Sequence, residues 1–315
     1  MRVAPFFYSK PTTPLNLSAS VTLAAGQRAV PDTRALENPF RGSALIDAVT
    51  FTVSKIGNQN SDYSGMVLCR FRVGHVELSP TDIPISLFTT SLQSYPAVEL
   101  AVGPTTPFVQ VSVCRRWKLP VPLLVPPGAA LVPSFFRPID SSGVDVTVDV
   151  SYAGRYLDSS EPLPDKIQVP YVNAFYPPPE GWFNGDSLNT FYLSGPRTLA
   201  NLLDVPVRVQ RFIGRVYDIT DTFPFLGNVV ESSANTSTSL FSVLMKDSYG
   251  REIVKDSVGF GALFDVIRRS WTFSKILGPR EHYLMNIYNT PGFNPPQPNR
   301  IPMVSIIGIR EENFR

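Results

Sequence analysis

Apolar and polar residues alternate along several short stretches of the chain. The clearest alternation runs through residues 144–152, where four valines and a tyrosine occupy every second position. This two-residue period is typical of a strand with one buried face. Weaker alternation runs through residues 45–53, 67–73 and 109–113. Many short strands separated by proline-rich turns predict an all-β sandwich or barrel.

One uncharged stretch imitates a membrane-spanning helix in its length. Residues 119–136 carry no charged side chain, but they include five prolines, each of which removes or distorts helical hydrogen bonds. We therefore expect two apolar strands joined at Pro126-Pro127-Gly128. A helix is predicted at residues 256–269, where Asp256 and Ser257 would cap a run with helical spacing of apolar residues.

The two halves of the chain repeat the same order of features. Residues 36–41 match residues 203–208 without a gap, and residues 115–117 match residues 269–271, each triplet ending in tryptophan. Apolar strands follow each match. A chance match between two halves of biased composition is the alternative, but the collinear order favours duplication. We predict two tandem eight-stranded jelly-roll β-sandwiches with a few short helices.

The repeat and the proline content set the predicted domain boundaries. A chain of 315 residues suits two domains better than one. The predicted parts are an N-terminal basic arm at 1–35, a first jelly roll at 36–157, a proline-rich connector at 158–195 and a second jelly roll at 196–315. The connector's aromatic residues, Trp182 among them, either pack along the sandwiches or form a platform on which a ligand stacks.

Charge and cysteine usage narrow the classes of partner. The formal net charge of +2 is too small for wrapping nucleic acid, so no direct sequence-specific nucleic acid binding is expected. Cys69 and Cys114 lack metal-ligand spacing and lie in strand-like runs, which predicts reduced, packed thiols. The first ten residues do not resemble a signal peptide, and we expect synthesis in a cytoplasm.

Candidate catalytic groups are sparse. The two histidines, His75 and His282, lie far apart in unlike contexts, and phosphate-loop and nucleophile-elbow motifs are missing. Asp145 and Asp149 share a strand face, but four residues at about 3.3 Å each place them roughly 13 Å apart, too far for a glycosidase pair. We predict no catalytic, cofactor or metal site, and a protein that is not an enzyme.

The first ten residues combine positive charge with aromatic side chains. This candidate contact site consists of Arg2, Phe6, Phe7, Tyr8 and Lys10. Basic residues are attracted to anionic membrane surfaces, so the segment is expected to contact a membrane or a neighbouring subunit. The alternative is an arm that lies over its own domain.

The duplicated stretches, the collinear strands and the preceding arm resemble the double jelly-roll major capsid proteins of the tectivirus, corticovirus and adenovirus lineage. The resemblance implies a homotrimer with six sandwiches around its axis, a pseudo-hexamer that tiles an icosahedral shell over an internal lipid membrane, as in a membrane-containing bacteriophage. It further implies contacts with neighbouring trimers, with penton or vertex proteins and with minor capsid proteins. The expected location is the virion capsid, with the host cytoplasm during assembly.

Two other functions remain open on the sequence. The first is a two-sandwich spike or minor capsid protein that binds a carbohydrate or a receptor, with Trp182 and neighbouring aromatic residues as its platform. The second is an enzyme on a β scaffold, which would need a cleft with converging carboxylates. Exposed aromatic residues gathered in one groove would favour the binding function, whereas buried connector aromatics would favour the capsid function.

Overall fold

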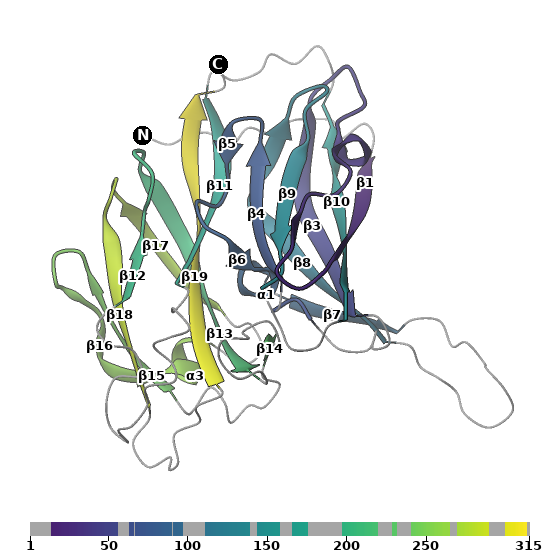
Figure 1. The fold of residues 1–315 in the computed structure, drawn as a ribbon. Helices are drawn as coiled ribbons and strands as arrows, with labels where there is room; N and C mark the ends of the chain where they lie inside the picture. Colours follow the sequence, from purple (N-terminus) through teal and green to yellow (C-terminus); the bar gives the residue numbers. More distant parts are fainter. Residues whose placement is uncertain are drawn as a thin grey trace, which may run out of the picture.

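The computed structural model describes residues 14–55, 63–65, 67–89, 91–96, 111–138, 144–157, 166–175, 197–219, 229–231, 241–264, 270–289 and 300–313. Within these ranges the chain forms four antiparallel sheets, arranged as two sandwiches that lie side by side (Figure 1). We call the sandwich built from residues 14–157 roll 1 and the sandwich built from residues 166–313 roll 2.

Roll 1 consists of two facing sheets and two short helical turns. The strands of its first sheet, in spatial order, are β1 (Pro14–Leu23), β10 (Val146–Tyr156), β3 (Ala44–Lys55), β8 (Val111–Val125) and β7 (Ser91–Pro96). The strands of its second sheet are β2 (Arg28–Ala29), β9 (Leu131–Phe136), β4 (Leu68–Val73) and β5 (Val76–Glu77), with β6 (Ile83–Pro84) also paired to β4. The helical turns are η1 (Thr33–Leu36) and α1 (Ile85–Phe88).

Roll 2 repeats this construction. Its first sheet contains β11 (Lys166–Phe175), β19 (Arg300–Asn313), β13 (Val207–Ile219), β17 (Ser270–Leu277) and the short β14 (Val229–Glu231). Its second sheet contains β12 (Arg197–Ala200), β18 (His282–Asn289), β15 (Phe241–Asp247) and β16 (Glu252–Gly259). One helical turn, α3 (Phe260–Leu263), follows β16.

The two rolls have the same strand order. β1-β10-β3-β8 corresponds to β11-β19-β13-β17, and β2-β9-β4-β5 corresponds to β12-β18-β15-β16. In both rolls the first strand pairs with the last strand and the second strand with the one before last, as in an eight-stranded jelly roll. The predicted fold, two tandem jelly rolls with a few short helices, is confirmed.

The strand register identifies equivalent residues in the two rolls. Trp117 lies opposite Val49, and Trp271 lies opposite Phe212, so the predicted tryptophan match is structurally correct. The predicted match between residues 36–41 and 203–208 is shifted by four residues, because Ala44 and Val207 both begin their strands opposite the last residue of β8 or β17. An even shift keeps every side chain on its own face, so alternation alone cannot detect it.

The same bulge interrupts β3 and β13, next to a glycine on the neighbouring strand. The register shifts after Ile46 in roll 1 and after Val209 in roll 2. Opposite these positions are Gly154 and Gly308. A Cβ atom on Gly154 would lie 2.0 Å from the carbonyl oxygen of Leu45, and one on Gly308 would lie 2.7 Å from that of Arg208. Close backbone approach at a bulge therefore requires glycine in both rolls.

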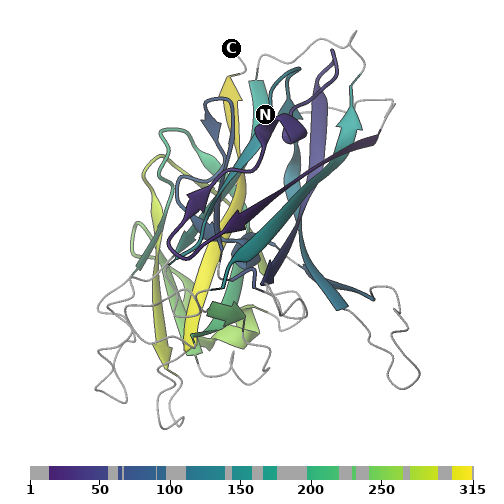
Figure 2. The ribbon, with the colours of Figure 1, turned by 45° about the vertical axis from the view of Figure 1, so that its right-hand side comes forward.

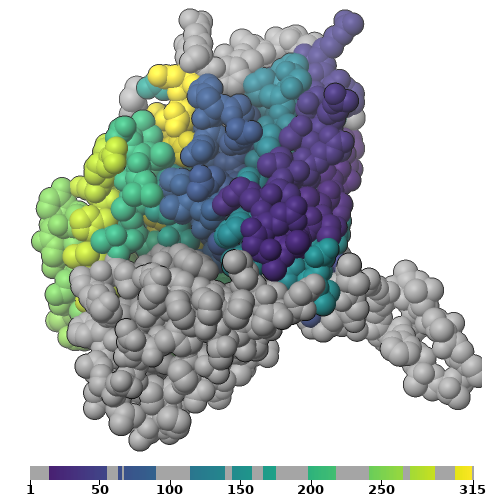
Figure 3. All heavy atoms as spheres, in the orientation of Figure 1, coloured from purple at the N-terminus to yellow at the C-terminus, as the bar shows by residue number. Residues whose placement is uncertain are grey.

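The cores of the two rolls join into one cluster of buried residues. Phe51, Phe71, Phe88 and Trp117 pack together in roll 1, with ring centroids 5.2 to 5.9 Å apart. The space-filling view shows the coloured atoms of roll 1 directly adjoining those of roll 2 (Figure 3). The pair therefore forms one body.

The structure differs from the predicted N-terminal arm. β1 lies within residues 1–35 and pairs with β10 along its whole length, at the outer edge of roll 1 (Figure 2). Apolar residues at alternate positions from Leu15 to Leu23 face the core. The period is weak in the sequence because the alternate positions hold serine, threonine and asparagine, which are also typical of a polar arm.

Two further predictions change in roll 2. β11 lies inside the predicted connector, 158–195, and is the first strand of roll 2. Its proline, Pro170, is tolerated because β11 lies at the edge of the sheet. The predicted helix at 256–269 is a single turn, α3, since Asp256 and Ser257 belong to β16 and residues 265–269 lie outside the described part. Asp256 has a φ of 57°, which is incompatible with a helix cap.

Candidate assembly surfaces

The predicted contact residues of the N-terminal arm, Arg2, Phe6, Phe7, Tyr8 and Lys10, lie outside the described residues. So do Trp182 and most of the connector aromatics. Tyr171 and Phe175 lie in β11. Tyr171 is fully buried, and its hydroxyl donates to the carbonyl oxygen of Ala200 at 3.2 Å. Burial raises the pKa of Tyr171 to about 12. This aromatic side chain therefore packs within roll 2 and offers no stacking platform.

Helical turn α1 of roll 1 lies against the outer face of β13 and β19 in roll 2. Ser86 and Tyr217 share a hydrogen bond of 2.6 Å between their hydroxyl groups. The hydroxyl of Ser305 donates to the carbonyl oxygen of Leu87 at 2.6 Å. All four residues are buried. Because each polar group has its partner away from water, this contact fixes one arrangement of the two rolls.

Polar groups extend the contact along β19 on both sides of Ser305. The guanidinium of Arg215 donates to the carbonyl oxygen of Thr89 at 2.6 Å, and the backbone N–H of Val172 donates to the carbonyl oxygen of Leu78 at 3.0 Å. Arg310 donates to the carbonyl oxygen of Glu77 in β5. Two rolls connected by bonds to main-chain carbonyls cannot slide past each other without breaking several of them. We call these interactions, together with those of α1, the roll–roll contact.

A small apolar cluster completes the roll–roll contact on roll 1. Leu45 and Leu124 are neighbours on the outer face of β3 and β8, and both are buried. Leu157, after β10, covers them, and Ile167 at the start of β11 packs against the cluster. The start of roll 2 therefore seals an apolar patch on the outer face of roll 1.

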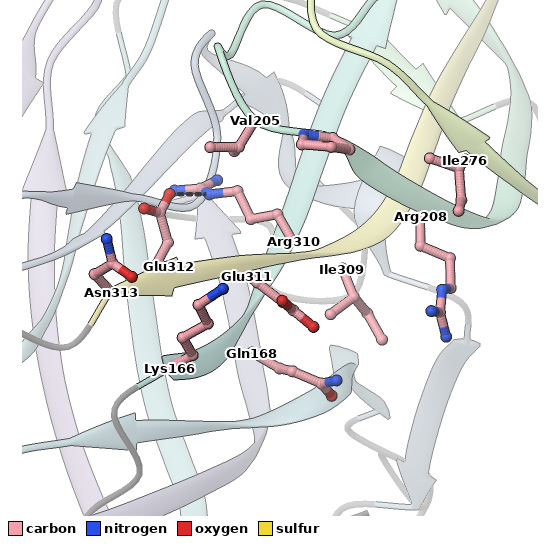
Figure 4. Close-up of a pocket in the computed structure, with 11 residues that line it drawn as sticks. Lys166, Gln168, Val205, Arg208, Ile276, Ile309, Arg310, Glu311, Glu312 and Asn313 are labelled. Carbon is pink, nitrogen blue, oxygen red and sulfur yellow. Dashed lines mark hydrogen bonds and ion pairs between the residues drawn. The ribbon is translucent and has the colours of Figure 1, made fainter. Parts of the chain in front are cut away.

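The corresponding patch on roll 2 is open and forms a groove of about 450 Å³ (Figure 4). Its outward-facing side chains come from β11, β13, β17 and β19; they are Lys166, Gln168, Arg208, Ile276, Ile309 and Glu311. Ile276 is 60% exposed, more than any other aliphatic residue among the exposed large hydrophobic residues of the described part. Arg310 pairs with Glu312 at 2.6 Å at one end of the groove. An exposed apolar side chain ringed by charges is typical of an interaction site.

A second open surface is the outer face of β1, β10 and β3 in roll 1. The register places small polar side chains in rows across the three strands; these are Ser18, Ser151 and Thr50 in one row and Ser20, Asp149 and Thr52 in the next. The hydroxyls of Thr22 and Thr147 continue the pattern, 3.2 Å apart. None of these residues is buried. We call this surface the hydroxyl face.

A third surface is the outer side of β2, β9 and β4, a hollow of about 410 Å³ lined partly by arginines. Arg28 forms a bidentate pair with Asp82, and Arg70 lies 3.4 Å from the same carboxylate. The hydrogen bond that Arg28 donates to Asp82 raises the pKa of Arg28, which leaves its charge unchanged at neutral pH. The exposed positive charge is therefore partly neutralised within roll 1.

The described cysteines and the described groups that could bind a metal ion do not form a cluster. Cys69 and Cys114 are both buried and free, as predicted, and burial raises the pKa of each thiol. Among the described residues, no group of three or more His, Cys, Asp or Glu could hold a metal ion. Within the same ranges, helices of the length and apolar character needed to cross a membrane are not found.

No protein family model and no curated protein matches the chain. Among solved structures, the STIV MCP is 14% identical with a TM-score of 0.45, over 94% of this chain and 96% of that chain. A chain in the atomic structure of Sulfolobus Turreted Icosahedral Virus is 13% identical with a TM-score of 0.48, over 95% and 91%. The mavirus major capsid protein is 8% identical with a TM-score of 0.38, over 99% and 89%. The double jelly-roll assignment rests on the strand order of this chain itself.

Proposed function

We propose that this chain is the major capsid protein of an icosahedral virus, a structural subunit rather than an enzyme. The observation that carries the proposal is the pair of jelly rolls with one strand order, packed side by side through the roll–roll contact. A shell subunit has to be rigid, and it has to present lateral surfaces that make the same contact many times. The two rolls supply the rigid body, and the groove and the hydroxyl face supply open lateral surfaces.

The proposed assembly unit is a homotrimer. Three subunits with two similar rolls each would place six rolls around one axis, a pseudo-hexamer that packs in a hexagonal lattice. In such a ring the contact within a subunit and the contact between subunits are related but not identical. Divergence between the outer faces of roll 1 and roll 2 is what this arrangement requires.

The other proposed partners follow from the same role. Neighbouring trimers, penton or vertex proteins and minor capsid proteins would surround the trimer in the virion capsid, after assembly in the host cytoplasm. We assign the segment with Arg2, Phe6, Phe7, Tyr8 and Lys10 to contacts with a neighbouring subunit or with an internal lipid membrane, as in a membrane-containing bacteriophage. Sequence-specific nucleic acid binding is not part of the proposal.

The mass of the purified chain in solution tests this function. Sedimentation velocity over a concentration series is expected to show a species with three times the mass of the chain. A chain that stays monomeric at every concentration, including concentrations at which capsid subunits are assembled in vitro, would contradict the proposed role. Incubating the same sample with glycan arrays tests the alternative carbohydrate-binding function, for which the proposal expects no signal above a control protein.

A further inference from the structure

We propose that contact between subunits repeats the roll–roll contact, with α3 and the groove of one copy lying against β1 and the hydroxyl face of the next. This inference rests on the proposed trimer and names the surfaces that form it. The partner is a second copy of this chain. The strand register makes residues of roll 1 equivalent to residues of roll 2.

The first observation concerns α1 and α3, which occupy the same place in the two rolls: α1 lies between β5 and β8, and α3 lies between β16 and β17. All four residues of α1 are buried, because its outer side lies against β13 and β19 of roll 2. In α3, at the same place in roll 2, only Phe260 is buried, and Ala262 is exposed. The turn that makes the contact in roll 1 is thus present in roll 2, with its outer side uncovered.

The second observation concerns the apolar patch on the outer face of β8 in roll 1 and of β17 in roll 2. The register makes Ile276 the equivalent of Leu124, and Arg208 the equivalent of Leu45. Leu124 is 4% exposed because the start of β11 and Leu157 cover it, whereas Ile276 is 60% exposed. The equivalent of Ile167 in the first strand of roll 1 precedes Pro14 and lies outside the described residues. Within the described part of one copy, Ile276 therefore lacks the cover that Leu124 has.

The third observation concerns the surface on which a helical turn is received. In roll 2 the outer face of β13 and β19 receives α1, and Ile213, Arg215 and Ser305 on it are buried. Their equivalents in roll 1 are Thr50, Thr52 and Ser151, on the hydroxyl face. These residues are partly exposed, so the other described residues of the copy do not cover the receiving surface of roll 1.

The chemistry of the hydroxyl face indicates what kind of contact it makes. Short serine and threonine side chains let a neighbouring element approach the backbone closely, and each hydroxyl both donates and accepts hydrogen bonds. A contact on this face is more polar than the roll–roll contact, and ordered water can bridge groups that do not touch directly. We therefore expect the contact between copies to be reversible, while the contact within a copy forms with the fold.

A repeated contact of this kind joins different surfaces of successive copies, head to tail. Such contacts close into a ring when the rotation between copies divides a full turn, and otherwise they build a filament. Closure after three copies gives the proposed trimer. The contact surfaces and the trimer can be tested separately.

The test compares three variants with the wild type by sedimentation velocity over a concentration series. Ile276→Asp alters the groove, and Ser151→Arg alters the hydroxyl face. Val30→Asp is the matched control, because Val30 is an exposed aliphatic residue, 45% exposed, in the hollow on the other sheet of roll 1. Circular dichroism and the Tm confirm that each variant is folded. All four proteins are measured as the full chain.

Ile276→Asp and Ser151→Arg are each expected to weaken trimer formation by about ten-fold or more, a loss of about 1.4 kcal/mol per tenfold, while Val30→Asp assembles as the wild type does. If the wild type is trimeric and both contact variants assemble with unchanged affinity, this inference is overturned and the proposed function stands. If the wild type is monomeric throughout, both are overturned. If Val30→Asp weakened trimer formation as much as Ile276→Asp and Ser151→Arg do, this inference would also be overturned, because the loss of assembly would then not depend on the groove or the hydroxyl face.

Discussion

Asn38 and Asn201 occupy equivalent positions in the two rolls and make the same hydrogen bonds. Each side-chain NH₂ donates to the carbonyl oxygen four residues ahead and to the carbonyl oxygen of the last residue of β8 or β17. Each side-chain oxygen accepts a hydrogen bond from the backbone N–H two residues ahead. The acceptors and donors are Gly42, Val125 and Phe40 for Asn38, and Val205, Leu277 and Leu203 for Asn201. Asn38 is 2% exposed and Asn201 is fully buried. One asparagine therefore connects two turns at the same end of each roll.

Replacing either asparagine with alanine is expected to destabilise its roll. Asn38→Ala and Asn201→Ala each leave buried backbone groups without partners, at a cost of about 1–3 kcal/mol per group. Chemical denaturation of each variant measures the free energy of unfolding. Glu37→Ala, at the exposed neighbouring position, is the control and should change it by less than about 0.5 kcal/mol. Similar small effects for the asparagine variants would show that the shared bonds are not stabilising.

The glycines beside the bulges predict a graded effect. Gly154→Ala should destabilise the chain more than Gly308→Ala, because the added Cβ meets a carbonyl oxygen at 2.0 Å in the first case and at 2.7 Å in the second. Overpacking at such a site costs about 3 kcal/mol or more when the neighbour is backbone. Gly259→Ala is the control, since nothing lies within 4 Å of its added Cβ. Thermal unfolding would contradict the account if all three variants melted together.

The hydrogen bond between Ser86 and Tyr217 provides a test of the roll–roll contact. Tyr217→Phe and Ser86→Ala each leave one buried hydroxyl without this partner, at about 1–3 kcal/mol. The double variant should cost less than the sum of the two single changes, because removing both groups leaves neither hydroxyl behind. Tyr249→Phe is the control, as its hydroxyl bonds Glu281 on the exposed surface. Strictly additive effects would mean that the two residues do not interact.

Asp247 predicts a loss of stability in acid. Its burial alone would raise the pKa, but hydrogen bonds from the backbone N–H of Arg251 and from Lys275 lower it well below the usual range. A carboxyl with a lower pKa in the folded state stabilises the fold above its unfolded pKa of about 3.9, and this contribution is lost as the pH falls below that value. Asp247→Asn should therefore be less stable than the wild type at pH 7 and lose less on acidification.

The comparison for this prediction is Asp204→Asn. Asp204 pairs with Arg280, but its side chain is 85% exposed, so water screens the pair and its removal should change the free energy of unfolding at pH 7 by less than the Asp247 substitution does. Denaturation series at several pH values between 7 and 2 give both slopes. An Asp247→Asn slope identical to that of the wild type would show that this carboxyl does not contribute.

The alternation of residues 144–152 predicts β10, because burial of one face imposes the two-residue period directly. The prolines of the uncharged stretch 119–136 exclude a helix and so predict the end of β8 and β9. The tryptophans also aligned the two halves correctly. The match of residue 36 with residue 203 does not align Asn38 with Asn201, because the structural correspondence is shifted from it by four residues. The contact surfaces could not be predicted, since Thr50 and Ile213 become equivalent only through the register of distant strands.

The most direct test of the central claim is the outline of the assembled protein in negative-stain electron microscopy. Two jelly rolls per subunit and three subunits per assembly predict two-dimensional class averages with a hexagonal outline, six lobes and three-fold symmetry. A single two-lobed particle, or an assembly whose symmetry is two-fold or four-fold, would contradict the account.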